Sequence, residues 1–74
     1  MKVSLSHLAD KWPSSIVSRS QVRNFTGGIL SGRYLANLDS QGEGPEGRLR
    51  VGRQVAYRVD SLIRWMEKRT EVVE

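Results

Sequence analysis

The stretch RLRVGRQVAYR, residues 48–58, decides the fold that the sequence predicts. Its apolar side chains stand at odd positions on both sides of a glycine: Leu49, Val51, Val55 and Tyr57. Such alternation with a period of two is typical of half-buried antiparallel strands. We expect one hairpin over about residues 48–59, with Gly52 and Arg53 at its tip. Its odd positions should pack on the core and its even positions should face solvent.

The same stretch holds the excess positive charge of the protein. Four arginines and no acid give it a charge of +4, whereas the remainder of the 74 residues sums to zero, with eight cations and eight anions. A solvated edge hairpin needs polar outward positions, but like charges repel one another without structural benefit. Nine of the twelve cations are arginines, whose planar guanidinium group forms forked contacts with phosphate. We therefore expect the hairpin to contact a polyanion.

Two short helices joined by a glycine-containing turn are predicted before the hairpin. The first lies within residues 18–27, which begin with capping-box spacing. The second starts after Ser31, a favourable N-cap. Gly27 and Gly42 suit left-handed C-caps at the two helix ends. This order predicts a helix-turn-helix over about residues 18–41.

Two outer helices complete the predicted domain, over about residues 4–12 and about residues 60–69. Apolar residues recur at helical spacing in both segments, after Ser4 and Asp60 as expected N-caps. One tryptophan lies on the apolar face of each segment, which favours a core anchor over a platform for base stacking. We expect a single domain over residues 1–74 that is mainly α with a small β-hairpin.

Residue types disfavour several other functions. With no cysteine and one histidine, only scattered carboxylates could bind a metal, so we expect no metal and no cofactor. GEGPEG, residues 42–47, has the letters of the dinucleotide fingerprint, but a helix precedes it and a strand follows, the reverse of what that motif requires. Capping explains the serines, so no catalytic residue is assigned and no enzyme is expected. Without an apolar run of membrane-spanning or signal-peptide length, we expect a cytoplasmic protein with no membrane partner.

Two further segments resemble a known family. LSGRYLANLDSQGEGP, residues 30–45, followed by RVGRQVAYRVDSLIRWME, residues 50–67, is similar to the domains of excisionases and MerR-type regulators, including AlpA-like phage regulators. The shared features are a Ser-capped helix, a G-x-G-P turn, a G-R-x-V-x-Y hairpin and a helix ending in L-x-x-W. The resemblance implies a winged helix-turn-helix, with the recognition helix in the major groove and the hairpin as a wing on the minor groove or backbone.

The function implied by the resemblance is sequence-specific binding of double-stranded DNA. Family members act as recombination directionality factors that bend DNA and steer an integrase toward excision, or as small regulators of transcription in phages and mobile elements. The implied contacts from the helix are Ser31, Gly32, Arg33, Tyr34 and Asn37. Those from the wing are Arg48, Arg50, Arg53 and Gln54. Three to five phosphate contacts give a slope of about −3 to −4.5 for log K against log salt, so a monomer binds weakly and dimers, cooperative arrays or an integrase partner are expected.

Three points stay open on the sequence alone. Asp39 stands where many relatives carry a basic or neutral residue, and facing DNA it would either repel phosphate or accept a hydrogen bond from a cytosine amino group. SHLADKWPSSIV, residues 6–17, is either a lid over the core or a surface for another protein. The alternative function is a non-catalytic protein-interaction module that uses the winged helix as a scaffold and the basic hairpin to contact an acidic partner.

Overall fold

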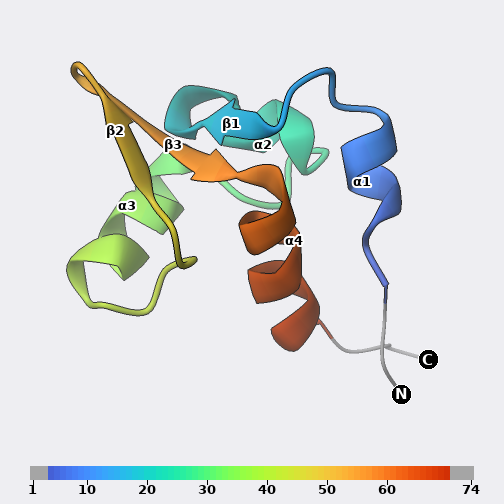
Figure 1. Cartoon of the computed structure of the whole chain (residues 1–74). Helices are drawn as coiled ribbons and strands as arrows, with labels where there is room; N and C mark the ends of the chain where they lie inside the picture. The colour runs from blue at the N-terminus through green and yellow to red at the C-terminus, as the bar shows by residue number, and fades with distance from the viewer. Residues whose placement is uncertain (1–3, 71–74) are drawn as a thin grey trace.

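Helices and three strands form a small α+β domain. The computed structural model describes residues 4–70 of the chain. In chain order the elements are α1 (His7–Asp10), β1 (Ile16–Ser18), the 3₁₀ helix η1 (Arg19–Gln21), α2 (Val22–Phe25), α3 (Gly32–Ser40), β2 (Leu49–Val51), β3 (Gln54–Arg58) and α4 (Val59–Lys68). Figure 1 shows α3 and the β2–β3 hairpin on one side of the molecule, α1 on the other, and α4 between them. The expectation of a mainly α chain with only a hairpin is therefore too narrow.

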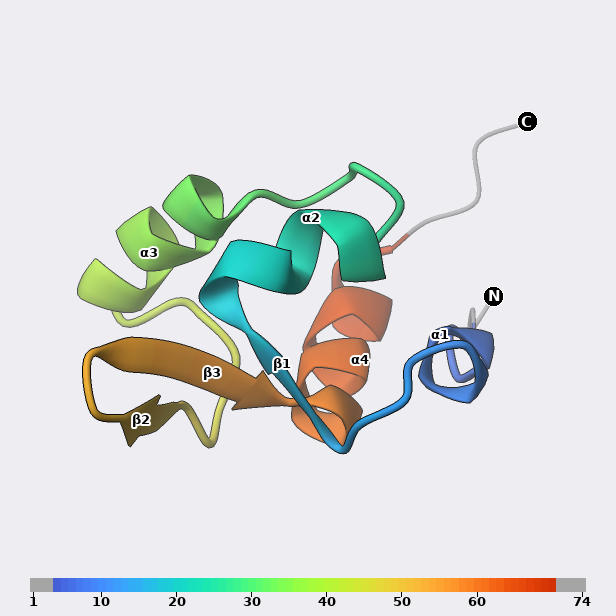
Figure 2. The same cartoon turned by 90° about the horizontal axis from the view of Figure 1, so that it is seen from above.

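The three strands form one antiparallel sheet in the order β1, β3, β2. Val17 of β1 lies opposite Tyr57 of β3, and Leu49 of β2 lies opposite Ala56. β1 was not predicted, because a strand of three residues is too short to show an alternating pattern. Its pairing adds a third strand to the predicted hairpin (Figure 2).

The hairpin itself is confirmed, with Gly52 and Arg53 as its two-residue loop. Gly52 has a φ of +61°, and no residue other than glycine has a positive φ within residues 4–70. A positive φ at the first loop position alone is the pattern of a type II′ turn, which matches the twist of paired strands.

The two faces of β2 are exchanged relative to the prediction. Cross-strand partners share one face of a sheet, so Arg50 lies on the same face as its partner Val55, and Tyr57 lies there too. A two-residue loop pairs an odd position with an even one, so the odd positions of β2 and β3 point to opposite faces. Placing Leu49 and Val51 on the core with Val55 and Tyr57 was therefore wrong, and Val51 is 65% exposed.

We name the two faces of the sheet by their residues. The α3 face carries Val17, Arg50, Val55 and Tyr57. The outer face carries Ile16, Ser18, Leu49, Val51, Gln54, Ala56 and Arg58.

The two N-terminal helices are shorter than predicted. α1 has four residues, and its N-cap is Ser6 instead of Ser4. The helix predicted within residues 18–27 divides into η1 and α2, and Ser18 forms no capping bond with its side chain. Helices of one turn depend on tertiary packing, which spacing along the sequence does not reveal. Gly27 nevertheless follows α2 with the expected positive φ, +67°.

α3 begins and ends where the sequence predicts. The backbone N–H of Tyr34 donates to Ser31 Oγ at 3.1 Å, which confirms the N-cap. At the other end Gly42 has a φ of +76°, and the N–H of Glu43 donates to the carbonyl of Leu38 at 2.9 Å. This Schellman motif satisfies carbonyl groups at the helix end and turns the chain toward the hairpin.

The N-cap of α4 lies two residues before the predicted Asp60, and the helix runs over Val59–Lys68. Arg58 is its N-cap, and Asp60 lies in the first turn, where the helix dipole favours an acid. Both tryptophans pack against the core, as predicted. The indole N–H of Trp65 donates to the carbonyl of Glu43 at 3.0 Å, so α4 supports the loop that follows α3.

The apolar core lies between the α3 face of the sheet, α2, α3 and α4. Its buried members are Val17, Val22, Phe25, Leu30, Leu35, Tyr57, Val59, Leu62, Ile63 and Met66. One buried polar side chain stabilises the turn between α2 and α3: Thr26 Oγ1 donates to the carbonyl of Val22 at 2.9 Å and accepts from the N–H of Leu30 at 3.0 Å. The core therefore holds α3 and the hairpin on one scaffold.

Candidate nucleic-acid interface

α3 presents a polar stripe to solvent. Arg33, Tyr34 and Asn37 are exposed, whereas Leu35 and Leu38 are buried against the core. The spacing of three and four residues within the exposed set places these side chains on one side of the helix. Three of the predicted helix contacts are thus available to a partner.

Ser31 and Gly32, also predicted as contacts, have structural roles. Ser31 Oγ accepts the capping bond at the start of α3. A Cβ atom on Gly32 would lie 2.6 Å from the carbonyl oxygen of Arg19, so glycine is needed for the close approach of α3 to η1. For these two residues a DNA contact stays a prediction.

The hairpin residues predicted as contacts divide between the two faces. Arg50 lies on the α3 face and Arg53 at the tip, whereas Gln54 belongs to the outer face. Within residues 4–70, no carboxylate lies within 4.0 Å of the guanidinium nitrogens of Arg33, Arg50 or Arg53, and all three side chains are exposed. We call these three residues the open arginines. Arg48, by contrast, lies 3.4 Å from Asp39 Oδ1 through Nη1.

A shallow groove of about 350 Å³ separates α3 from the hairpin. Arg19 of η1, Arg33 of α3 and Arg53 of the hairpin tip line it, together with Gln54. Residues that lie up to 36 positions apart in the chain are therefore brought to one concave surface by the packing of η1 against both α3 and β3. The part of its lining that residues 4–70 supply is basic, with no acidic side chain.

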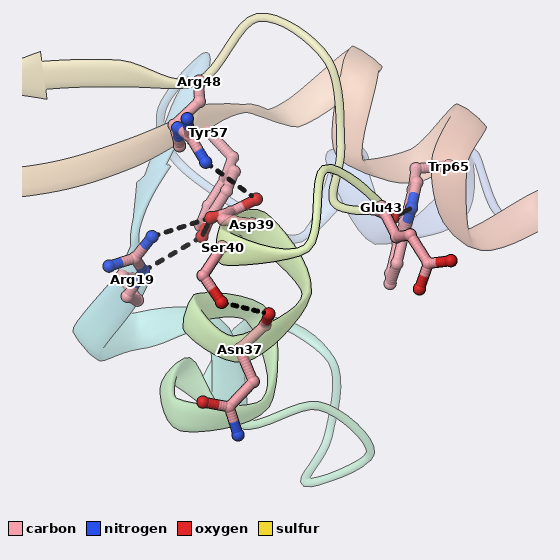
Figure 3. A network of polar contacts seen from close by, with 8 residues as sticks. All are labelled: Arg19, Asn37, Asp39, Ser40, Glu43, Arg48, Tyr57 and Trp65. Carbon is pink, nitrogen blue, oxygen red and sulfur yellow. Dashed lines mark hydrogen bonds and ion pairs between the residues drawn. The ribbon is translucent and has the colours of Figure 1, made fainter.

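Asp39 joins three segments of the chain beneath this surface (Figure 3). Its Oδ2 accepts hydrogen bonds from the Tyr57 hydroxyl at 2.6 Å and from Arg19 Nη2 at 2.7 Å. Arg19 Nε also donates to the Tyr57 hydroxyl oxygen at 3.0 Å, and Arg48 pairs with Oδ1. The Asp39 side chain is only 4% exposed. It does not face a partner, so neither role considered for it at the DNA surface applies.

The network keeps its charged and neutral groups in fixed states at neutral pH. Burial, together with the hydrogen bond to Asp39, raises the pKa of Tyr57 to about 12. Burial alone lowers the pKa of Arg19, but its bonds to Tyr57 and Asp39 outweigh that effect and raise the pKa above the ordinary value. Tyr57 therefore remains a hydrogen-bond donor and Arg19 remains a cation.

A sequence signal for the position of Asp39 exists. Asp39 follows Leu35 by four residues, which places it on the buried side of α3. A buried carboxylate needs hydrogen-bond donors, and arginine and tyrosine supply them here. The partners Arg19 and Tyr57 lie 20 and 18 residues away in sequence, so spacing alone does not identify them.

The opposite side of the molecule has a wider cleft of about 1100 Å³ between α1 and α4. Its apolar lining comes from Ala9, Ile16, Leu49, Val59 and Ile63. Its charged lining is mixed, with Arg58 and Arg64 beside Asp60 and Glu67. The backbone N–H of Leu5 donates to Glu67 Oε2 at 2.6 Å and ties the segment before α1 to α4.

Two other kinds of site are absent from the described part of the chain. Over residues 4–70, no three histidine, aspartate or glutamate side chains gather closely enough to hold a metal ion. No helix in that range combines the length and the apolar character needed to cross a membrane. The basic groove and the α1–α4 cleft are two candidate binding surfaces of the described residues.

Comparisons with protein-family models, with curated proteins and with solved structures give no match for this chain. The function assigned to the groove between α3 and the hairpin therefore rests on its own geometry and charge.

Proposed function

We propose that the protein binds double-stranded DNA, without catalysis, through α3 and the β2–β3 hairpin, as a winged helix-turn-helix domain. The observation that carries the proposal is the position of the open arginines. All three lie on the side of the molecule formed by α3 and the hairpin. Arg33 and Arg53 line one groove with Arg19, and Arg50 lies on the α3 face of the sheet. A surface with one sign of charge attracts a polyanion, and arginine matches the geometry of phosphate.

The arrangement supports separate roles for the helix and the hairpin. The major groove of B-DNA admits an α-helix, and the exposed stripe of α3 carries residue types that read base edges. Arg33 can donate two hydrogen bonds to a guanine, and Asn37 can form a bidentate pair with an adenine. Arg53, at the hairpin tip, then contacts phosphates or enters a narrow minor groove. Arg50 contacts the backbone beside it.

The number of open arginines bears on how tightly one molecule binds. On random-sequence DNA, where Arg33 contacts a phosphate as Arg50 and Arg53 do, three phosphate contacts give a slope of about −2.7 for log K against log salt. This is the shallow end of the sequence expectation, because Arg48 is paired with Asp39 and Arg58 lies on the outer face. Binding by one molecule is then weak, and we propose that further copies or a protein such as an integrase add to it on DNA. An excisionase-like factor or a small regulator of a mobile element fits this requirement.

Fluorescence anisotropy with a short random-sequence duplex over a salt series tests the proposal. We expect binding with a slope of about −2.7. Affinity that does not change with salt, or no binding at low salt, contradicts it.

The open arginines also favour a second function, contact with an acidic protein. Polyglutamate, as a probe with carboxylates in place of phosphates, separates the two. Duplex DNA should bind more tightly than polyglutamate at equal salt if base and phosphate geometry matter, because carboxylate chains lack the grooves. Binding to polyglutamate with none to duplex DNA would instead assign the surface to an acidic protein partner.

A further inference from the structure

Asp39 contacts each segment that borders the proposed DNA surface. It belongs to α3, and its carboxylate binds Arg19 of η1, Arg48 just before β2 and Tyr57 of β3. Figure 3 shows these side chains converging on Asp39 from the sheet and from η1, while Asn37 of the same helix points away from them. The Asp39 carboxylate therefore lies at the point where contacts can fix the angle between α3 and the hairpin.

The backbone packs closely around Asp39 and its network. A Cβ atom on Gly44 would overlap Asp39 Oδ1, so the loop after α3 passes directly over the carboxylate. On the far side of the network, α3 is in close backbone contact with η1 at Gly32. All buried polar side-chain atoms in residues 4–70 have hydrogen-bond partners. A fully satisfied network in a packed site specifies one geometry.

The charge of Asp39 by itself opposes the proposed function. An acid beneath a basic surface lowers the attraction of that surface for phosphate, and its carboxylate pairs with the guanidinium of Arg48 in place of a phosphate. Any favourable effect of Asp39 on DNA binding therefore has to come through geometry, and geometry affects the discrimination between sequences more than the attraction to all of them.

We propose that Asp39 is a positioning residue that makes DNA binding sequence-selective. It acts through Arg48, Tyr57 and Arg19, holding the hairpin at one angle to α3. With that angle fixed, Arg33 and Asn37 reach base edges only on a duplex whose minor groove and phosphate backbone also fit Arg53. This inference rests on the proposed function. It states that a buried acid, Asp39, determines how well the basic surface distinguishes one DNA sequence from another.

The test compares Asp39→Asn with Asp60→Asn. Both substitutions remove one negative charge, but Asp60 is on the outer side of the molecule, with a side chain that is 72% exposed and pairs with Arg64 at 3.9 Å. The probes are a duplex enriched from a random library by the wild-type protein, and the unselected library itself. Anisotropy titrations over a salt series give the affinity for each probe, the ratio of the two affinities and the slope for the library.

We expect Asp39→Asn to bind the unselected library at least as tightly as wild type, because Arg48 is released. Its slope should become steeper by about 0.9, for one additional phosphate contact. The ratio of affinities should fall about tenfold or more, the loss that one mismatched base pair typically causes. Asp60→Asn should keep the wild-type ratio and slope. A merely unfolded protein would lose affinity for both probes, so these opposite changes distinguish positioning from stability.

A wild-type ratio in Asp39→Asn overturns the inference, and so does a wild-type protein that binds the library but enriches no sequence. A wild-type protein without salt-dependent binding to the library contradicts the proposed function itself. If circular dichroism shows that Asp39→Asn does not fold, Tyr57→Phe replaces it, because this variant keeps the charge and removes one bond to the carboxylate. We then expect a several-fold lower ratio in folded Tyr57→Phe, and an unchanged ratio overturns the inference.

Discussion

The two sides of the sheet differ in charge although one hairpin contributes to both. On the α3 side, Arg33 and Arg53 line a groove to which residues 4–70 contribute no acidic side chain, and Arg50 lies on the same side. On the outer side, Leu49 and Arg58 line a cleft whose charged lining is half acidic. The two-residue loop causes this difference between the two sides. It pairs even positions of β2 with odd positions of β3, so Arg50 shares a face with Val55 and Tyr57, while Leu49 and Val51 lie on the other face. Composition alone shows an excess of arginine in the hairpin, but the register shows which side of the molecule receives it.

Removing two positive charges from the α3 side, or two from the outer side, tests the difference between the two sides most strongly. Arg50→Ala with Arg53→Ala and Arg58→Ala with Arg64→Ala both lower the net charge from +4 to +2. Only the first pair belongs to the proposed interface. We expect its salt slope on random duplex to become shallower by about 1.8, and its affinity to fall roughly tenfold to a hundredfold.

The outer-side pair is the matched control for that experiment. Arg64 forms an exposed pair with Asp60, which contributes about 0 to 1 kcal/mol to stability, and donates an exposed hydrogen bond to Ser61 Oγ at 3.4 Å. For the double variant Arg58→Ala with Arg64→Ala, the slope of log K against log salt should stay at the wild-type value. Equal losses in the two double variants would mean that net charge, rather than the α3 side, determines binding.

Two valines test the assignment of residues to the two faces of the sheet. Val17 lies on the α3 face and is 1% exposed, whereas Val51 lies on the outer face and is 65% exposed. Urea unfolding should show a loss of about 2 kcal/mol for Val17→Ala and less than about 0.5 kcal/mol for Val51→Ala. A comparable loss for Val51→Ala would place Val51 in the core and contradict the register of β2.

The smallest expected effect concerns the hydrogen bond beneath the α3 side. The pKa of Tyr57 is raised from 10.0 to about 12, so the folded state keeps the phenol proton at pH values where the unfolded chain loses it. This contribution to stability is complete below pH 10 and is lost as the pH rises to about 12. Tyr57→Phe should cost about 1 kcal/mol at neutral pH, for one hydrogen bond.

Urea unfolding of wild type and Tyr57→Phe at several pH values between 8 and about 12 measures this contribution. The difference in the free energy of unfolding should shrink as the pH rises above 10, since the wild type loses its advantage. A constant difference over the whole range would show that the Tyr57 proton is not held by the folded state.

The sequence predicts features whose cause is local. The N-cap at Ser31 and the left-handed turn at Gly42 depend on neighbouring residues, and the structure confirms both. The tip of the hairpin depends on Gly52 and is likewise confirmed. The exposed positions of Arg33 and Asn37 follow from helical spacing in the same way.

The features that were missed depend on contacts between distant segments. β1 exists because Ile16–Ser18 pair with β3, and this pairing has no pattern within three residues. The faces of β2 were misassigned because the prediction put the odd positions of both strands on one face. The two-residue loop puts the odd positions of β2 and β3 on opposite faces. Asp39 was considered for the surface because its partners Arg19 and Tyr57 are far away in the chain. Helical spacing from Leu35 would have placed its side chain inside.

The position of the DNA on the protein is the most direct test of the central claim, which is that the α3 side contacts the duplex. Titration of the ¹⁵N-labelled protein with a short duplex, followed by amide chemical shifts, locates the contact residue by residue. We expect the largest changes in α3, at Arg33 and Asn37, and around Arg53 in the hairpin loop. Ala9 and Ile63, which line the cleft between α1 and α4, should change little. Changes concentrated along that cleft, with α3 and the hairpin loop unaffected, would contradict the account.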